Sequence, residues 1–136
     1  MSLWTFRDYE TEDGENHIRS WYEAQIVAVQ AAFRAAVIQL GGRPNWQDNP
    51  LFKDLKKAHT GLSEIRFFVG EKHAPNFRRF RPVGICDPVQ RNFIFLVGCE
   101  KFKGGRTEPE MAFELALFLK SQFEQGKGTT RGHRYD

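Results

Sequence analysis

The chain has little cysteine, and this scarcity limits the kinds of protein that it can be. Among its 136 residues are two cysteines, Cys86 and Cys99. Both lie in apolar, strand-like sequence, where a buried reduced thiol is the usual state of a cysteine. One possible bridge in a chain of this length is not a disulfide framework. We therefore expect reduced cysteines and a cytoplasmic location.

Long apolar runs and metal-ligand spacings are also missing. No run approaches the roughly 20 apolar residues that a membrane helix needs, and the first residues lack the basic and apolar stretches of a secretory signal. The histidines are far apart along the chain and lack the spacing of zinc ligands; they are His17, His59, His73 and His133. We expect no membrane association, no metal and no cofactor.

The apolar content that is present suffices for one hydrophobic core. Hydrophobic residues make up 40% of the chain, and 13 residues are phenylalanine. A chain of this size can bury a core without disulfides or metals. We predict a single domain over residues 1–125, followed by a flexible, basic, glycine-rich tail over residues 126–136.

The spacing of apolar residues predicts an α+β protein. Apolar steps of three and four indicate helices, whereas alternation or short continuous apolar runs indicate strands. The predicted strands are 4–9, which is edge-like, then 62–69, 77–85 and 92–102. The predicted helices are 17–40, 49–57 and a last one from a capping box at Thr107–Glu110 to about residue 125. We expect a small, largely antiparallel sheet with the helices packed on one face and the apolar strand 92–102 in its centre.

Positive charge is concentrated in the middle of the chain. Residues 31–107 hold 14 basic and 6 acidic side chains, whereas residues 1–30 hold 2 basic and 6 acidic ones. Side chains two apart in a strand point the same way, and each middle strand carries such a polar pair: Glu64 and Arg66, Arg79 and Arg81, Lys101 and Lys103. If the strands are neighbours, the pairs form one cationic patch on the open face, facing a phosphate backbone. An ordinary solvated strand face is the alternative.

The C-terminal tail carries two side chains of catalytic type. His133 and Tyr135 stand beside Arg131 and Arg134, although a loose tail has no folding reason to contain an imidazole and a phenol. The sequence leaves two interpretations open, an acid/base role and unattached tail residues.

Four short segments occur in the order typical of a known family. They are Gly61-Leu62-Ser63-Glu64-Ile65-Arg66, Arg79-Phe80-Arg81, Glu100-Lys101-Phe102-Lys103 and Thr107-Glu108-Pro109. With the long helix before them, they resemble the RelE/HigB superfamily of toxins, in its phage-derived, HigB-like branch. The resemblance extends over about residues 4–123. In this chain Phe102 separates two lysines that are adjacent in the family.

The resemblance implies a RelE-like fold and a toxin of a two-gene toxin–antitoxin module. Such a toxin cleaves mRNA on the ribosome without metal, and a helix-turn-helix antitoxin neutralises it. By position, the resemblance and the charge pattern together give the catalytic candidates Arg66, Arg81, Lys101, Lys103 and His133, and the RNA-binding candidates Arg78, Arg79, Arg106 and Tyr135. The family also contains gyrase-directed and catalytically silent members. A non-catalytic docking protein, binding gyrase or a phage-derived partner, is therefore the alternative.

Overall fold

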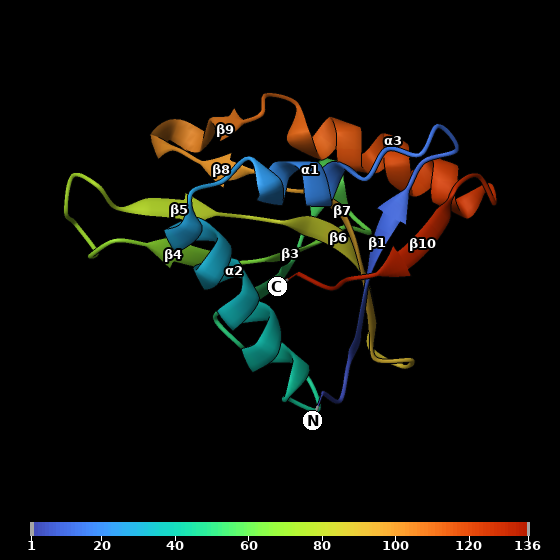
Figure 1. The fold of residues 1–136 in the computed structure, drawn as a ribbon, viewed down its shortest axis with the longest axis horizontal. Helices are drawn as coiled ribbons and strands as arrows, with labels where there is room; N and C mark the ends of the chain where they lie inside the picture. The colour runs from blue at the N-terminus through green and yellow to red at the C-terminus, as the bar shows by residue number, and fades with distance from the viewer. Residues whose placement is uncertain (1, 136) are drawn as a thin grey trace.

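The computed structural model describes residues 2–135 and has an α+β architecture (Figure 1). Its α-helices are α1 (His17–Glu23), α2 (Val27–Gly41) and α3 (Ala112–Glu124), and its short 3-10 turns are η1 (Lys57–His59) and η2 (Lys103–Gly105). The strands are β1 (Thr5–Glu10), β2 (Phe52–Asp54), β3 (Ser63–Ile65), β4 (Phe67–Val69), β5 (Arg78–Phe80), β6 (Val83–Asp87), β7 (Asn92–Val97), β8 (Glu100–Lys101), β9 (Thr107–Glu108) and β10 (Thr129–Gly132).

The strands form two sheets of unequal size. The larger sheet has the order β10-β1-β7-β6-β3-β2, and the smaller has the order β4-β5-β8-β9. Among the strand pairs of residues 2–135, the β1–β7 pair is parallel and the others are antiparallel. The strands are thus mixed but mostly antiparallel, which confirms the predicted fold class at this level.

Each of the three β runs in the middle of the chain, predicted above as the strands 62–69, 77–85 and 92–102, is divided and contributes one strand to each sheet. The runs break at Arg66, at Arg81–Pro82 and at Gly98–Cys99, and we call these three breaks the seam. Hydrogen bonds join the breaks, since Ile65 N donates to Pro82 O at 2.9 Å and Arg81 N donates to Cys99 O at 2.8 Å. Proline has no N–H with which to continue a ladder, which accounts for the gap between the end of β5 at Phe80 and the start of β6 at Val83.

Helices cover both faces of the larger sheet, so the prediction of one covered face is wrong. In β7, Phe93 and Phe95 belong to the core under α1 and α2, whereas Ile94 and Leu96 belong to the core under α3. Successive residues of a strand point to opposite faces. The continuous apolar run of β7 therefore supplies two cores, and β7 is covered on both faces.

The predicted helix over residues 17–40 is interrupted. The chain leaves α1 after Glu23 and re-enters α2 at Val27, with Ile26 in an extended conformation. The backbone N–H of Gln25 and the side-chain amide of Gln30 both donate to Tyr22 O, each at 3.0 Å, so this carbonyl has partners although α1 stops there. The break allows α1 to pack on β1 and β7 while α2 packs on β4.

Two predictions of local structure are wrong because tertiary pairing overrides helix signals. The predicted helix 49–57 instead forms β2 and η1; β2 pairs with β3, and the ring of Phe52 packs on Trp46 with centroids 5.3 Å apart. The predicted capping box at Thr107–Glu110 instead forms β9, which pairs with β8. As a result α3 begins at Ala112, after Met111 in a left-handed conformation with φ 59°.

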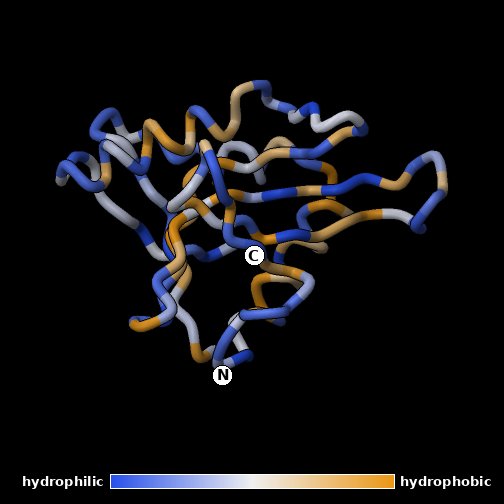
Figure 2. The backbone as a smooth tube through the Cα atoms, turned by 180° about the vertical axis from the view of Figure 1, so that it is seen from behind, coloured by the Kyte–Doolittle hydropathy of each residue, from blue (hydrophilic) through white to orange (hydrophobic). Residues whose placement is uncertain are grey.

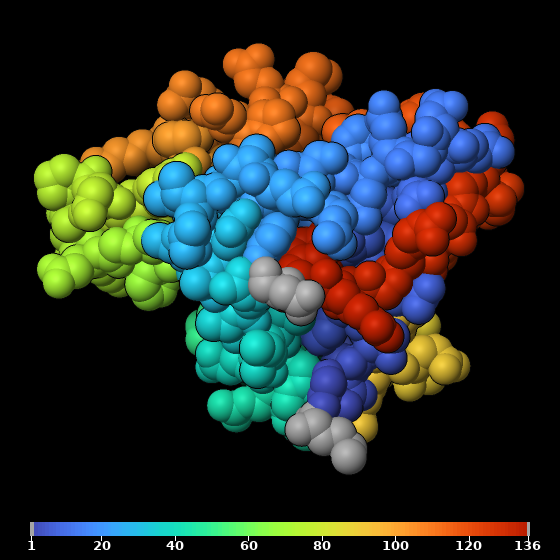
Figure 3. Space-filling model, in the orientation of Figure 1, coloured from blue at the N-terminus to red at the C-terminus, as the bar shows by residue number. Residues whose placement is uncertain are grey.

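The C-terminal tail, predicted to be flexible, is built into the larger sheet as β10. This strand pairs antiparallel with β1, so β1 is not the edge strand that its alternation suggested. Arg7 Nη2 donates to Thr130 O at 2.9 Å and reinforces the pairing. Figure 3 shows the tail (red) running across the front of the molecule, below the segment of α1 (blue). Asp136, the last residue of the predicted tail, lies outside the described residues.

A buried carboxylate holds the end of the tail. Asp8 is 1% exposed, and its Oδ1 lies 2.7 Å from His133 Nδ1. Its Oδ2 accepts hydrogen bonds from Tyr135 OH at 2.7 Å and from Asn16 Nδ2 at 3.0 Å. Burial, with the Asp8 charge beside it, raises the pKa of Tyr135 above its ordinary range. The ring of His133 also packs on Phe95, with centroids 4.6 Å apart.

Replacing this carboxylate is predicted to destabilise the protein. Asp8→Ala removes the acceptor shared by His133, Tyr135 and Asn16, so we expect the free energy of unfolding to fall by about 3 kcal/mol. Glu10→Gln is the control on the same strand, because its ion pair with Arg131 is exposed on the arginine side and contributes little to stability. Urea denaturation followed by circular dichroism measures both. Equal small losses in the two variants would contradict the role given to Asp8.

Candidate nucleic-acid interface

The smaller sheet extends beyond the helices and carries a row of aligned side chains on one face. Figure 2 shows the β4–β5 hairpin projecting from the rest of the molecule. The register places Phe68 opposite Arg79, Arg79 opposite Lys101, and Lys101 opposite Thr107. Directly paired positions in a sheet share a face. The polar side-chain pairs predicted on neighbouring strands therefore do meet, because the two cations Arg79 and Lys101 lie side by side on different strands.

Two arginines of the seam continue this row. Arg66 and Arg81 lie at the breaks next to β4 and β5, and Arg81 is close enough to Arg66 and Arg79 for both of their charges to act on it. Arg66 Nε donates to Glu64 Oε1 at 3.0 Å, and the side chain of Glu64 is 6% exposed. We call Arg66, Arg79, Arg81 and Lys101 the cationic face.

Arg81 is the least compensated member of the cationic face. Burial lowers its pKa, and the nearby positive charge of Arg66 acts in the same direction, whereas Glu64 opposes them. Its Nε is buried and has no hydrogen-bond partner among the described residues. Buried polar atoms normally have partners, and an arginine keeps its positive charge in proteins. An anionic group bound beside this guanidinium would balance its charge.

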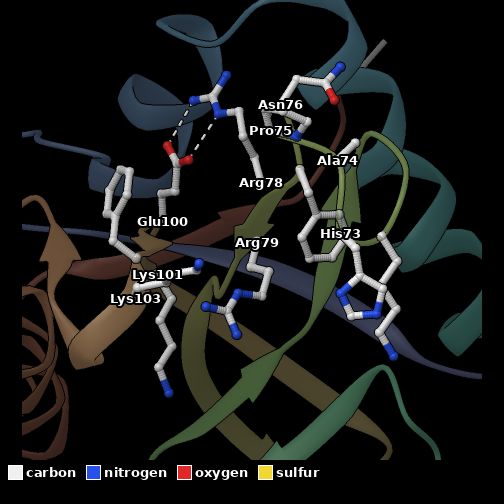
Figure 4. A pocket seen from close by; sticks show the side chains of 12 residues that line it. His73, Ala74, Pro75, Asn76, Arg78, Arg79, Glu100, Lys101 and Lys103 are labelled. Atoms are coloured by element: carbon white, nitrogen blue, oxygen red, sulfur yellow. Dashed lines mark hydrogen bonds and ion pairs between the residues drawn. The ribbon is translucent and has the colours of Figure 1, made fainter.

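A groove of about 780 Å³ runs alongside the row and is lined by residues 72–79 and 100–103. One wall is the loop of the β4–β5 hairpin, and the other is β8 with the turn η2. In Figure 4 the side chains of Arg79, Lys101 and Lys103 gather on one side, while Arg78 and Glu100 turn away and join each other. The groove is thus open to a ligand that the lysines and Arg79 can reach.

Arg78 is separated from the cationic face. Glu100 accepts two hydrogen bonds from it, at 2.9 Å from Nε and at 2.7 Å from Nη2, and these bonds raise the pKa of Arg78. Its guanidinium carbon lies 5.0 Å from the ring centroid of Phe80. The charge of Arg78 is therefore balanced within the fold.

The remaining predicted site residues are divided between two regions. Lys103 lines the groove, and Arg106 lies near it, with its guanidinium carbon 4.5 Å from the ring centroid of Phe102. The structure does not bring His133 and Tyr135 to the arginines. Both are held by Asp8 in the core under α1 and α2, which is the opposite face of the sheets from Arg66 and Arg81.

His73 lies in the groove, although the sequence did not predict it as a site residue. It belongs to the loop between β4 and β5, and the antiparallel pairing of these strands brings that loop beside Arg79. The available signal was the loop with Gly70 and Pro75 between two β runs. Such a loop predicts a hairpin, and hence a histidine at its tip.

The two thiols are protected. Burial raises the pKa of both Cys86 and Cys99 to about 12, and Cys99 Sγ lies 3.1 Å from Arg81 O. A thiolate is the nucleophilic form of cysteine, so neither residue is activated at neutral pH.

Thiol reactivity tests this arrangement directly. At pH 8 we expect the folded protein to react with an aromatic disulfide reagent roughly a thousandfold more slowly than the unfolded chain, because the raised pKa depletes the thiolate. Stopped-flow absorbance measurements with and without denaturant give both rates. In Cys99→Ala, any reaction that remains comes from Cys86. Reaction of the folded protein at the unfolded rate would disprove the burial of these thiols.

Within residues 2–135, no three histidine, cysteine or acidic side chains are grouped to hold a metal ion. None of the helices in this range has both the length and the apolar content to cross a membrane. No protein-family model, curated protein or solved structure matches the chain.

Proposed function

We propose that the protein is the toxin of a toxin–antitoxin module, with a RelE-like fold, that cleaves mRNA on the ribosome in the cytoplasm. The observation that carries the proposal is the convergence of Arg66, Arg79, Arg81 and Lys101: Arg79 and Lys101 are paired and line a groove, and the charges of Arg66 and Arg79 both act on the partly buried Arg81. The motif resemblance supports it, because these four positions are among the nine catalytic and RNA-binding candidates that the resemblance and the charge pattern gave. A helix-turn-helix antitoxin is the partner that the resemblance implies.

In the proposed reaction, the RNA supplies its own nucleophile. A ribose 2′-oxygen forms a bond to the adjacent phosphorus while the bond from phosphorus to the 5′-oxygen breaks. The 2′-hydroxyl proton passes to a base, and the departing 5′-oxygen takes up a proton from the solvent, so the products are a 2′,3′-cyclic phosphate and a 5′-hydroxyl end. Negative charge grows on the non-bridging oxygens, and Arg81 and Arg66 bind them because the guanidinium fork matches a phosphoryl group. Preorganised donors of this kind contribute about 3–4 kcal/mol each to catalysis.

Two side chains near the arginines are candidates for accepting the 2′-hydroxyl proton. Glu64 is a carboxylate positioned by its hydrogen bond to Arg66, and Lys101 stands opposite Arg79. A carboxylate accepts a proton in its ordinary charged form, whereas an amine accepts one only when neutral. Glu64→Gln and Lys101→Ala separate the two, because the true base is the one whose loss removes the acidic limb of the pH–rate profile, where the rate rises as the base loses its proton.

Loss of Arg81 is predicted to abolish toxicity without unfolding the protein. Expressed alone in a bacterial host, the wild type should arrest growth and produce new 5′ ends inside translated codons. Arg81→Ala should lower cleavage by roughly 10²–10³-fold, because it removes a donor to the developing charge. Arg43→Ala, at an exposed arginine on the loop after α2, is the matched control and should cleave like the wild type.

The other outcomes of this expression experiment are equally informative. Arrest without new 5′ ends would contradict the nuclease and favour the docking alternative, in which the same face binds gyrase or another partner. Toxicity that survives in Arg81→Ala would show that the cationic face is not the working surface.

The salt dependence of RNA affinity provides a second, independent test in vitro. Each phosphate that a protein neutralises on a single strand adds about 0.7 to the slope of log affinity against log salt. We expect Lys101→Ala to reduce this slope by about 0.7 for a short single-stranded RNA, measured by fluorescence anisotropy. Lys56→Ala, at an exposed lysine just before η1, should leave the slope unchanged. An unchanged slope in Lys101→Ala would remove Lys101 from the interface.

A further inference from the structure

Two phenylalanines on the β4–β5 hairpin have no role in the core. Phe68 is 59% exposed, and neither Phe68 nor Phe77 belongs to the hydrophobic clusters that hold the two sheets and the helices. Their rings contact each other, with centroids 5.3 Å apart and planes inclined at 45°. A single exposed apolar side chain is ordinary, but the exposed ring of Phe68 contacts the half-buried ring of Phe77 beside paired cations, an arrangement suited to a ligand.

The positions of these rings match the cations in register. Phe68 is directly opposite Arg79, which is directly opposite Lys101, so ring and charges share one face. Phe77 precedes Arg79 by two residues and therefore points to the same face. Phe77 also lines the groove from the hairpin side, and Phe102 lines it from the other side. A cavity of about 780 Å³ is in the usual range for a site that holds a small organic group.

We propose that the β4–β5 hairpin is a subsite for an unpaired nucleotide, in which Phe68 and Phe77 stack on the base while Arg79 and Lys101 bind the flanking phosphates. This inference rests on the proposed function and specifies it further. It adds a binding element outside the seam, and it states the form of RNA that fits. A base can stack on an aromatic side chain only when its face is free, and a duplex buries that face.

Interleaved aromatic and basic side chains are the usual means of holding a single strand. Stacking on an aromatic ring strengthens binding by roughly tenfold per base and tolerates any base, because every base has a π-face. The electrostatic part comes from the phosphates and depends on salt. The hairpin combines both elements on one face. It therefore predicts affinity for single strands that is partly independent of salt.

The test removes the aromatic ring from the full chain while leaving the charged side chains in place. Labelled RNA 12-mers are used as a single strand and as a duplex, together with an abasic strand of the same length. Phe68→Leu keeps an apolar side chain but removes the ring, and Phe68→Trp restores an aromatic face. Val89→Ala, at another exposed apolar position, is the matched control. Anisotropy gives the affinities, and thermal melting confirms that each variant is folded.

The expected result is a roughly tenfold weaker affinity of Phe68→Leu for the single strand, with the salt slope unchanged and with Phe68→Trp near the wild type. On the abasic strand, Phe68→Leu and the wild type should bind alike. Equal affinity of the wild type and Phe68→Leu for the single strand would overturn the stacking subsite and leave the proposed function intact. Wild-type protein that binds the duplex as tightly as the single strand would likewise overturn the stacking subsite but not the proposed function. A wild type that binds none of the three nucleic acids would overturn the proposed function together with the subsite.

Discussion

The seam between the two sheets is the constraint on which the rest of the structure depends. Three consecutive β runs bend at adjacent points, and backbone hydrogen bonds from Ile65 to Pro82 and from Arg81 to Cys99 hold those points together. The bends separate a layered core, with helices on both sides of β7, from a smaller sheet that extends past the helices (Figure 1). Because Arg66 and Arg81 occupy two of the bends, the same geometry that divides the fold also brings the arginines together.

Ion pairs with buried carboxylates determine how much of each cationic charge remains free to bind a ligand. Glu100 binds Arg78 through two hydrogen bonds, and Glu64 binds Arg66 through one. Asp8 has a different task, because it fixes His133 and Tyr135 against the core. Removing an unpaired charge from water is costly unless it is compensated, so these pairs stabilise the fold locally. The guanidinium of Arg81 is left partly buried beside the charges of Arg66 and Arg79, and this is why we place the phosphoryl group there.

The pairs of polar side chains on single strands, and the fact that both members of a pair point to the same face, could be predicted from the sequence, because alternation along a strand is a local property. For this reason the pairs Arg79–Arg81 and Lys101–Lys103 indicated the region in which the structure brings these cations together. The covering of both faces, the β10 strand and the position of His133 could not be predicted, because each depends on contacts between residues far apart in the chain. Asp8 and His133 are 125 positions apart. No local pattern in the tail signals that its imidazole has a buried partner. His73 illustrates the intermediate case, in which a recognised hairpin loop would have sufficed to place the side chain.

The central claim is that RNA lies across the smaller sheet and the seam, on the face of Arg66, Arg79, Arg81 and Lys101. Ultraviolet cross-linking of the protein to a single-stranded RNA, followed by mass spectrometry of the peptides, tests it most directly. We predict cross-links in peptides from residues 66–81 and 99–106, with none from α1, α2 or the C-terminal tail that packs between α1 and β1. Cross-links concentrated on the Asp8, His133 and Tyr135 side would contradict the account, because they would place the RNA on the opposite face.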